Sequence, residues 1–237
     1  MKDKSISKIL RRIAVGEDSL LCNNHALPMF AEFQFEDIIF GVFPKVGASV
    51  RNAYDSWPNN SVGDVVEMLM QMLEALAFIH DLNIAHRDAF RDDFVVQWHP
   101  ESLRTIKISP SRPRVYLIDF EVAMIFPPEL TVDECLVAGF HSGGSFTGIE
   151  EYARAHAPEF YSGEAYSHFK LDVWQLEKSF KDFKSTISPI DQVLKDMYYS
   201  NPTHRLSAKE ALDILQTVVY SMTPESLLIK PVVAESL

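Results

Sequence analysis

One long apolar segment near the middle of the chain most restricts how this sequence can fold. Residues 62–82 are largely apolar, and four of their polar side chains, Asp64, Glu67, Gln71 and Glu74, are spaced three or four residues apart. On a helix, these four side chains form one narrow stripe on a cylinder that is otherwise apolar. The segment is therefore predicted to be a helix that other parts of the protein surround, and its charges argue against a membrane span.

Composition narrows the class of protein and the kinds of partner. The chain has 237 residues, of which 47% are hydrophobic, which allows one globular domain or two small lobes. A net charge of −11 makes nucleic acid and membrane surfaces poor partners. The two cysteines, Cys22 and Cys135, predict a reducing compartment, and no signal peptide is recognisable. The expected location is cytoplasmic or nuclear, although the basic N-terminus leaves a transit peptide as an alternative to an amphipathic helix.

Hydrophobic periodicity predicts an α+β fold with strands early and helices late. Besides the long helix, helices are predicted over 5–14, 169–183, 189–199 and 207–222, and strands over 29–33, 37–43, 94–98 and 114–118. The first two strands are expected to form a hairpin. Ser207 and Glu210 predict a capping box at the last helix. The aperiodic stretch 119–159 is typical of a functional segment.

Short motifs follow one another along the second half of the chain in a specific order. His86-Arg87-Asp88 comes first, and Asp119-Phe120-Glu121 follows a predicted strand about thirty residues later. Ala157-Pro158-Glu159, Asp172-Val173-Trp174 and Arg205 come next. Any one of these is typical of a solvated turn. In this order, over residues 5–222, they resemble the signatures of the eukaryotic protein kinase family, of the fungal type.

The resemblance implies a two-lobed kinase-like fold with a reduced N-lobe. Residues 5–48 would form a helix end, a β-hairpin and the hinge, residues 49–222 a nearly complete, mainly helical C-lobe, and residues 223–237 a tail. In this alignment the chain starts after the strands that carry the family's Gly-rich loop and its phosphate-binding Lys. An incomplete gene product is one expectation that follows.

The family assigns phosphoryl transfer to three acids. Asp88 would accept the hydroxyl proton of a protein substrate, and Asp93 and Asp119 would hold Mg²⁺ on the phosphates of ATP. The other implied site residues are His86 and Arg87 of the catalytic loop, and the hinge residues Phe43, Pro44 and Lys45 against the adenine ring. Arg87 would await a phosphorylated or acidic partner.

The resemblance also implies structural roles for several residues. Glu159 would form a buried ion pair with Arg205, and Asp172 would brace the backbone of the catalytic loop. His86 and Phe120 would each pack in the internal apolar spine.

Several positions depart from the family pattern. Phe90 stands where serine/threonine kinases have a Lys, although the neighbouring Arg91 could supply a cation, and Asp93 stands where Asn is usual. Glu121 replaces a glycine, and Glu177 replaces a small residue. Two functions follow as alternatives: an ATP- and Mg²⁺-dependent protein kinase of serine/threonine type, impaired as written, or a non-catalytic pseudokinase that binds a protein partner.

The glycine cluster 139–148 invites two other interpretations, which its sequence disfavours. The spacing of Gly139 and Gly144 fits a phosphate loop, but no Lys follows, and Thr147 stands where a serine-hydrolase elbow needs Gly. The cluster is predicted to belong to a mobile activation segment. Its candidate phosphorylation or peptide-contact positions are Ser142, Ser145, Thr147 and Tyr152.

Overall fold

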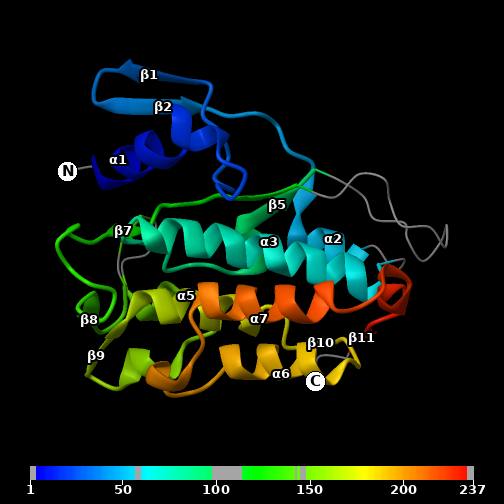
Figure 1. Ribbon diagram of the computed structural model, residues 1–237. Helices are drawn as coiled ribbons and strands as arrows, with labels where there is room; N and C mark the ends of the chain where they lie inside the picture. Colours follow the sequence, from blue (N-terminus) through cyan, green and yellow to red (C-terminus); the bar gives the residue numbers. More distant parts are fainter. Residues whose placement is uncertain (1–3, 57–59, 98–113, 142, 145–147, 234–237) are drawn as a thin grey trace.

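The computed structural model describes residues 4–56, 60–97, 114–141, 143–144 and 148–233, and the chain is an α+β protein, as predicted (Figure 1). The helices are α1 Lys4–Ile13, α2 Val50–Ser56, α3 Val62–Asp81, α5 His168–Lys178, α6 Ser188–Met197 and α7 Ala208–Tyr220. The strands are β1 Ala31–Phe35, β2 Ile38–Val42, β3 Ala48–Ser49, β4 Ile84–Ala85, β5 Phe94–Val96, β6 Val115–Leu117, β7 Met124–Ile125, β8 Leu136–Ala138, β9 Ala165–Ser167, β10 Phe183–Lys184 and β11 Val232–Val233.

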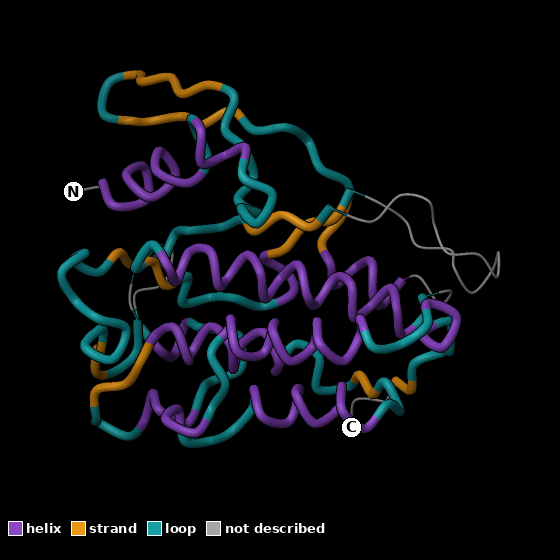
Figure 2. Tube along the Cα trace, in the orientation of Figure 1, coloured by secondary structure: helices purple, strands orange, loops and turns teal. Residues whose placement is uncertain are grey.

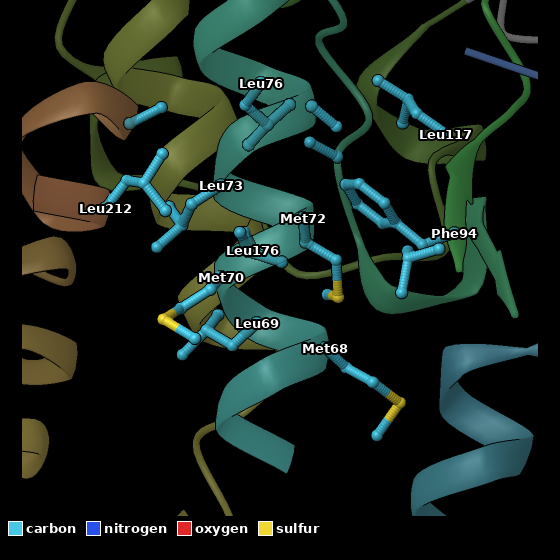
Figure 3. Close-up of a cluster of buried hydrophobic side chains, with 14 of the residues drawn as sticks. Met68, Leu69, Met70, Met72, Leu73, Leu76, Phe94, Leu117, Leu176 and Leu212 are labelled. Carbon is cyan, nitrogen blue, oxygen red and sulfur yellow. The ribbon is translucent and has the colours of Figure 1, made fainter. Parts of the chain in front are cut away.

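Helix α3 is the centre of the hydrophobic core, as the apolar segment predicts. It packs against α5, α7, β4 and β6. Figure 3 shows its methionine and leucine side chains with Leu176 of α5 and Leu212 of α7 on one side, and Phe94 and Leu117 on the other. Its first turn is closed by a capping box in which Ser61 and Asp64 satisfy each other's backbone N–H groups.

The polar stripe on α3 has a structural task. The side-chain oxygen of Gln71 accepts a hydrogen bond of 3.0 Å from the backbone N–H of Val115, at the start of β6. The carboxylate of Glu74 lies 2.8 Å from the imidazole of His25, whose other ring nitrogen contacts the carbonyl of Val115 at 2.8 Å. The stripe therefore holds β6 and the segment before β1 against the helix.

The described strands form small antiparallel sheets, the largest in the order β3-β5-β6. Strands β1 and β2 form the predicted hairpin, with Phe33 opposite Phe40. Figure 1 shows α1 beneath this hairpin, at the end of the molecule away from α6 and α7. In Figure 2 most of the helical segments lie on the other side of the β3-β5-β6 sheet from the hairpin.

Some predicted boundaries are wrong for identifiable reasons. Helix α5 ends at Lys178 and not at Phe183 as predicted. The prediction was too long because Phe180 and Phe183 are both buried apolar residues at helical spacing, whereas the chain between them forms a turn. Helix α2 is too short for its periodicity to stand out in the sequence. The predicted strand 94–98 ends at Val96, and residue 98 lies outside the described residues. None of the described helices combines the length and apolar character needed to cross a bilayer.

Glu177 on α5 is an acid in the core. It is 8% exposed, and its Oε2 has no hydrogen-bond partner among the described residues. Burial raises its pKa to about 7, against the opposing charges of Lys178 and Lys181. A raised pKa in the folded state means that this residue favours folding below pH 4.5, and that this contribution is lost as the pH rises through 7.

Glu177→Gln is therefore expected to stabilise the protein at pH 8 by about 2–3 kcal/mol and to leave its stability near pH 4 unchanged. Urea unfolding at several pH values measures the difference. The exposed Glu164→Gln is the matched control and should have no effect at either pH. Equal unfolding free energies of Glu177→Gln and the wild type at pH 8 would contradict the assignment.

Candidate functional site

The loop that carries Asp88 is fixed to helix α5. The carboxylate of Asp172 accepts hydrogen bonds from the backbone N–H groups of His86, at 2.8 Å, and Arg87, at 2.6 Å, and lies 2.9 Å from the imidazole of His80. Asp172 is fully buried. This confirms the prediction that Asp172 braces the backbone of this loop.

Two residues at the site have a left-handed backbone. Arg87 has a φ of 68° and Asp119 a φ of 63°. For residues other than glycine, this conformation persists only where the surroundings enforce it, and it is frequent at functional sites. At Arg87 the enforcing contact is the bond from its N–H to Asp172, together with the bond from its guanidinium Nε to the carbonyl of Val122, at 2.5 Å.

Strand register brings Asp93 and Asp119 together. Asp93 directly precedes β5 and Asp119 lies two residues beyond β6, and the antiparallel pairing of Phe94 with Leu117 places these ends side by side. The carbonyl of Asp93 accepts a hydrogen bond of 2.9 Å from the N–H of Ile118. The pairing of β4 with β7 brings the loop after β4, which carries Asp88, to the same place.

The segment before Ala157 closes over two of these acids. The hydroxyl of Tyr152 donates to Oδ1 of Asp88 at 2.5 Å. The guanidinium of Arg154 donates two hydrogen bonds to the carboxylate of Asp93, at 2.5 and 3.0 Å, and its Nε lies 3.5 Å from Oδ2 of Asp88. Two side chains from this one segment, Tyr152 and Arg154, thus contact the carboxylates of both Asp88 and Asp93.

Gln175 joins the closed segment to the loop. Its side-chain amide donates to the carbonyl of Arg87 at 2.9 Å and to the hydroxyl of Tyr152 at 3.2 Å, while its oxygen accepts from the N–H of Ala89 at 2.9 Å. Gln175 is fully buried, one helical turn after Asp172. Together these two side chains on α5 hold the loop and fix the position of Tyr152.

The acids share a single electrostatic environment. Burial raises the pKa of Asp88 and that of Asp93, and the negative charge of Asp119 adds to both increases. Arg154 opposes the increase at both acids. Burial and the adjacent charge of Asp88 raise the pKa of Tyr152, so its phenol stays protonated and acts as a hydrogen-bond donor.

The resemblance implies a Mg²⁺ ion at Asp93 and Asp119. With Tyr152 and Arg154 placed against the acids, the residues present do not fit such an ion. Both oxygens of Asp93 accept hydrogen bonds from Arg154, and Oδ1 of Asp88 accepts one from Tyr152. A guanidinium held between the acids excludes a divalent cation by charge and by space. Within the described ranges, no cluster of three or more His, Cys, Asp or Glu residues could hold a metal ion.

The cation beside the acids is not the one that the sequence suggests. Arg91 instead faces Asp182, at 3.5 Å, with its guanidinium 5.9 Å from the ring of Phe180, so the expectation that it serves Asp88 is wrong. Arg154 supplies that cation, and its guanidinium lies 5.1 Å from the ring of Phe90, the residue in place of the family's Lys.

Tyr152 is not an accessible modification site, contrary to the prediction, because it is 2% exposed and bonded to Asp88. Of the other positions proposed in that segment, Ser142, Ser145 and Thr147 lie outside the described residues. Glu121 lies against Gly144, where an added Cβ would come within 2.5 Å of its carboxylate. The absence of a side chain at Gly144 therefore leaves room for the carboxylate of Glu121, which stands where the kinase signature has a glycine.

The hinge residues lie on the hairpin side of the site. The ring of Phe43 packs on Gly41, where a Cβ would meet it at 2.8 Å, and Lys45 is exposed. In the described part of the chain no hydrogen bond or ion pair joins Phe43, Pro44 or Lys45 to the acids. Their contact with a nucleotide stays a prediction.

The predicted ion pair of Glu159 with Arg205 and the predicted internal packing of His86 and Phe120 are confirmed. Arg205 and Glu159 form a buried bidentate ion pair, with distances of 2.7 and 3.2 Å. The rings of His86 and Phe120 meet edge to face, 5.0 Å apart, and the imidazole of His86 donates to the carbonyl of Ile118 at 2.9 Å.

The sequence reasoning missed Arg154 and Gln175. Gln175 could have been found, because a polar residue three positions after Asp172 on a buried helix shares its face. Arg154 carries no local signal. Neither a scan against protein-family models nor a search of curated proteins finds a match for this chain.

Proposed function

We propose that this chain is a protein kinase-like domain that acts through contacts with other proteins rather than through phosphoryl transfer. The kinase-like part rests on the order of the motifs, together with the contacts of Asp172, of His86 with Phe120, and of Glu159 with Arg205. Fold similarity alone does not decide the activity, which depends on the site.

One observation carries the non-catalytic part of the proposal. The guanidinium of Arg154 donates hydrogen bonds to both carboxylate oxygens of Asp93, and its Nε also lies near Oδ2 of Asp88. In the family, Asp88 would have to accept a proton and Asp93 would have to hold a metal ion. The guanidinium takes up both oxygens of Asp93, and the phenol takes up Oδ1 of Asp88, so in this arrangement the two acids are engaged by the chain itself.

A phosphotransferase is the second candidate, because strand pairing brings Asp88, Asp93 and Asp119 to one place. In that function Tyr152 and Arg154 would have to move away before ATP and Mg²⁺ could bind.

A phosphate-transfer assay separates the two candidates. The wild type and Asp88→Asn are each incubated with Mg-ATP and a generic protein substrate. We expect the same background signal from both proteins, and no rise in the melting temperature on adding Mg-ATP, since a ligand that binds the folded state must stabilise it. Transfer by the wild type that Asp88→Asn abolishes would contradict the non-catalytic proposal.

Substitution of Arg154 tests the observation on which the proposal rests. Arg154→Met removes the cation from two buried carboxylates, so the free energy of unfolding should fall by about 2–4 kcal/mol. The freed acids should then bind a divalent cation. Added Mg²⁺ is therefore expected to raise the melting temperature of this variant and not that of the wild type.

Two matched variants make this result specific. Arg154→Met with Asp93→Asn should lose the response to Mg²⁺ and recover part of the lost stability. Arg51→Met breaks an exposed contact with Asp92, at 3.4 Å, and should change stability by less than about 1 kcal/mol. An equal response to Mg²⁺ in the wild type and in Arg154→Met would show that Arg154 does not block the acids.

A further inference from the structure

The hairpin β1–β2 has one face made only of apolar residues. In the antiparallel register, Ala31, Phe33 and Phe35 lie opposite Val42, Phe40 and Ile38, and side-chain alternation places these six residues on the same face. Three aromatic rings on this face are more than half exposed: Phe33 at 61%, Phe35 at 66% and Phe40 at 51%. We call these six residues the hairpin face.

The opposite side of the hairpin contacts the rest of the chain at Glu32 and Gly41, although Ile39 on that side is 40% exposed. Glu32 alternates with Phe33 and therefore points away from the hairpin face, toward α1, where Nε of Arg11 donates to its carboxylate at 3.0 Å. Met29 and Phe43 pack around Gly41 on that side. Figure 1 shows α1 on one side of the hairpin only. The hairpin face therefore has no such cover from the described helices.

The size of the hairpin face limits what can bind it. Its exposed rings and aliphatic side chains present roughly 400–500 Å² of apolar surface, within the size range of the largest apolar patch on a typical monomer, which is often functional. If two such faces meet, they bury roughly 900 Å² in total, which is below the size of stable specific interfaces and in the range of weak, transient ones. This area supports a weak dimer that depends on concentration.

Charges at the two ends of the hairpin make it self-complementary. The turn carries Glu36 and Asp37, both exposed, and Lys45 is exposed just beyond the open end. None of the three forms an ion pair with a described residue. In a two-fold contact with the hairpins antiparallel, each acidic turn lies over the basic end of the other copy. A contact with the turns side by side would instead bring four acids together.

We propose that the hairpin face binds a second copy of this chain, face to face and antiparallel, with Asp37 of each copy near Lys45 of the other. This inference rests on the proposed function, in that the chain works through protein contacts, and it names the partner as a copy of itself.

Sedimentation equilibrium of the full chain over a wide range of concentrations tests the proposal. The mean mass should rise from one chain toward two. Phe33→Thr with Phe40→Thr keeps residues suited to strands and should weaken association at least about tenfold. Tyr220→Thr is the control, because Tyr220 is 72% exposed at the end of α7, away from the hairpin. It should leave association unchanged.

A charge exchange tests the orientation of the two copies. Lys45→Glu should weaken association, and adding Asp37→Lys to it should restore much of the loss, because the pairing is re-formed with reversed signs. Single chains at every concentration, or association that the Phe33/Phe40 variant leaves unchanged, would overturn the proposal. If the double charge variant is no stronger than Lys45→Glu alone, the antiparallel orientation is overturned. These outcomes are independent of the phosphate-transfer assay, which tests the proposed function alone.

Discussion

Asp172→Asn is expected to lower the free energy of unfolding by about 3–5 kcal/mol, although the two side chains have the same shape. The carboxylate of Asp172 accepts from the N–H groups of His86 and Arg87 and contacts His80. An amide replaces one of the two acceptor oxygens with an NH₂ group that faces a donor. Because the site is fully buried, water cannot replace the lost bond.

Urea unfolding followed by tryptophan fluorescence measures this loss. Hydrogen exchange at the amides of His86 and Arg87 gives a second, local readout, and both amides should exchange much faster in the variant. Asp213→Asn is the control, since Asp213 forms an exposed ion pair with Lys209 and should cost less than about 1 kcal/mol. Unchanged exchange at both amides would contradict the bracing role.

The effect of Asp172→Asn should also depend on pH. Burial pushes the pKa of Asp172 upward, but the hydrogen bond and charge of His80 outweigh it and hold the pKa below its ordinary value. A depressed pKa in the folded state contributes stability above the ordinary value near 4, and this contribution is lost as the pH falls through the folded pKa. The difference between the wild type and the variant should therefore shrink in acid.

Where residues carry a local pattern, the sequence predicted the fold well. Helix α3 follows from its apolar surface, and the capping box of Ser207 and Glu210 at α7 is present as predicted. The short strand pairs β4–β7 and β8–β9 have no such pattern, because two or three residues are too few for alternation to be visible. Their pairing is decided by contacts between distant parts of the chain.

The same distinction applies to the site. The motif order predicted that Asp172 would brace the Asp88 loop, because those roles follow from the spacing of a family pattern. It did not predict that Arg154 would lie against Asp93. Residues 93 and 154 are 61 positions apart, and only the folded segment shows that the guanidinium reaches the carboxylate. Long-range pairing of charges is a property of packing, which periodicity does not encode.

Arg205→Met should cost about 3–5 kcal/mol of stability, because it leaves the carboxylate of Glu159 buried without its cation. Arg205 is 1% exposed, and its guanidinium also donates to the carbonyls of Tyr199, at 2.9 and 3.0 Å, and Lys170, at 2.8 Å. The surface substitution Lys209→Met is the matched control, in an exposed pair on α7, and should cost less than about 1 kcal/mol. Unfolding in urea compares the two variants directly.

A double variant separates the ion pair from the other bonds of Arg205. Glu159→Gln added to Arg205→Met removes the uncompensated charge, so part of the lost stability should return, while the carbonyls of Tyr199 and Lys170 stay without their donor. Glu159 ends the segment that carries Tyr152 and Arg154. Breaking the pair should therefore loosen that segment from the acids, and the amide of Tyr152 should exchange faster in Arg205→Met. If the double variant is no more stable than Arg205→Met, the buried charge of Glu159 is not what makes the single substitution costly.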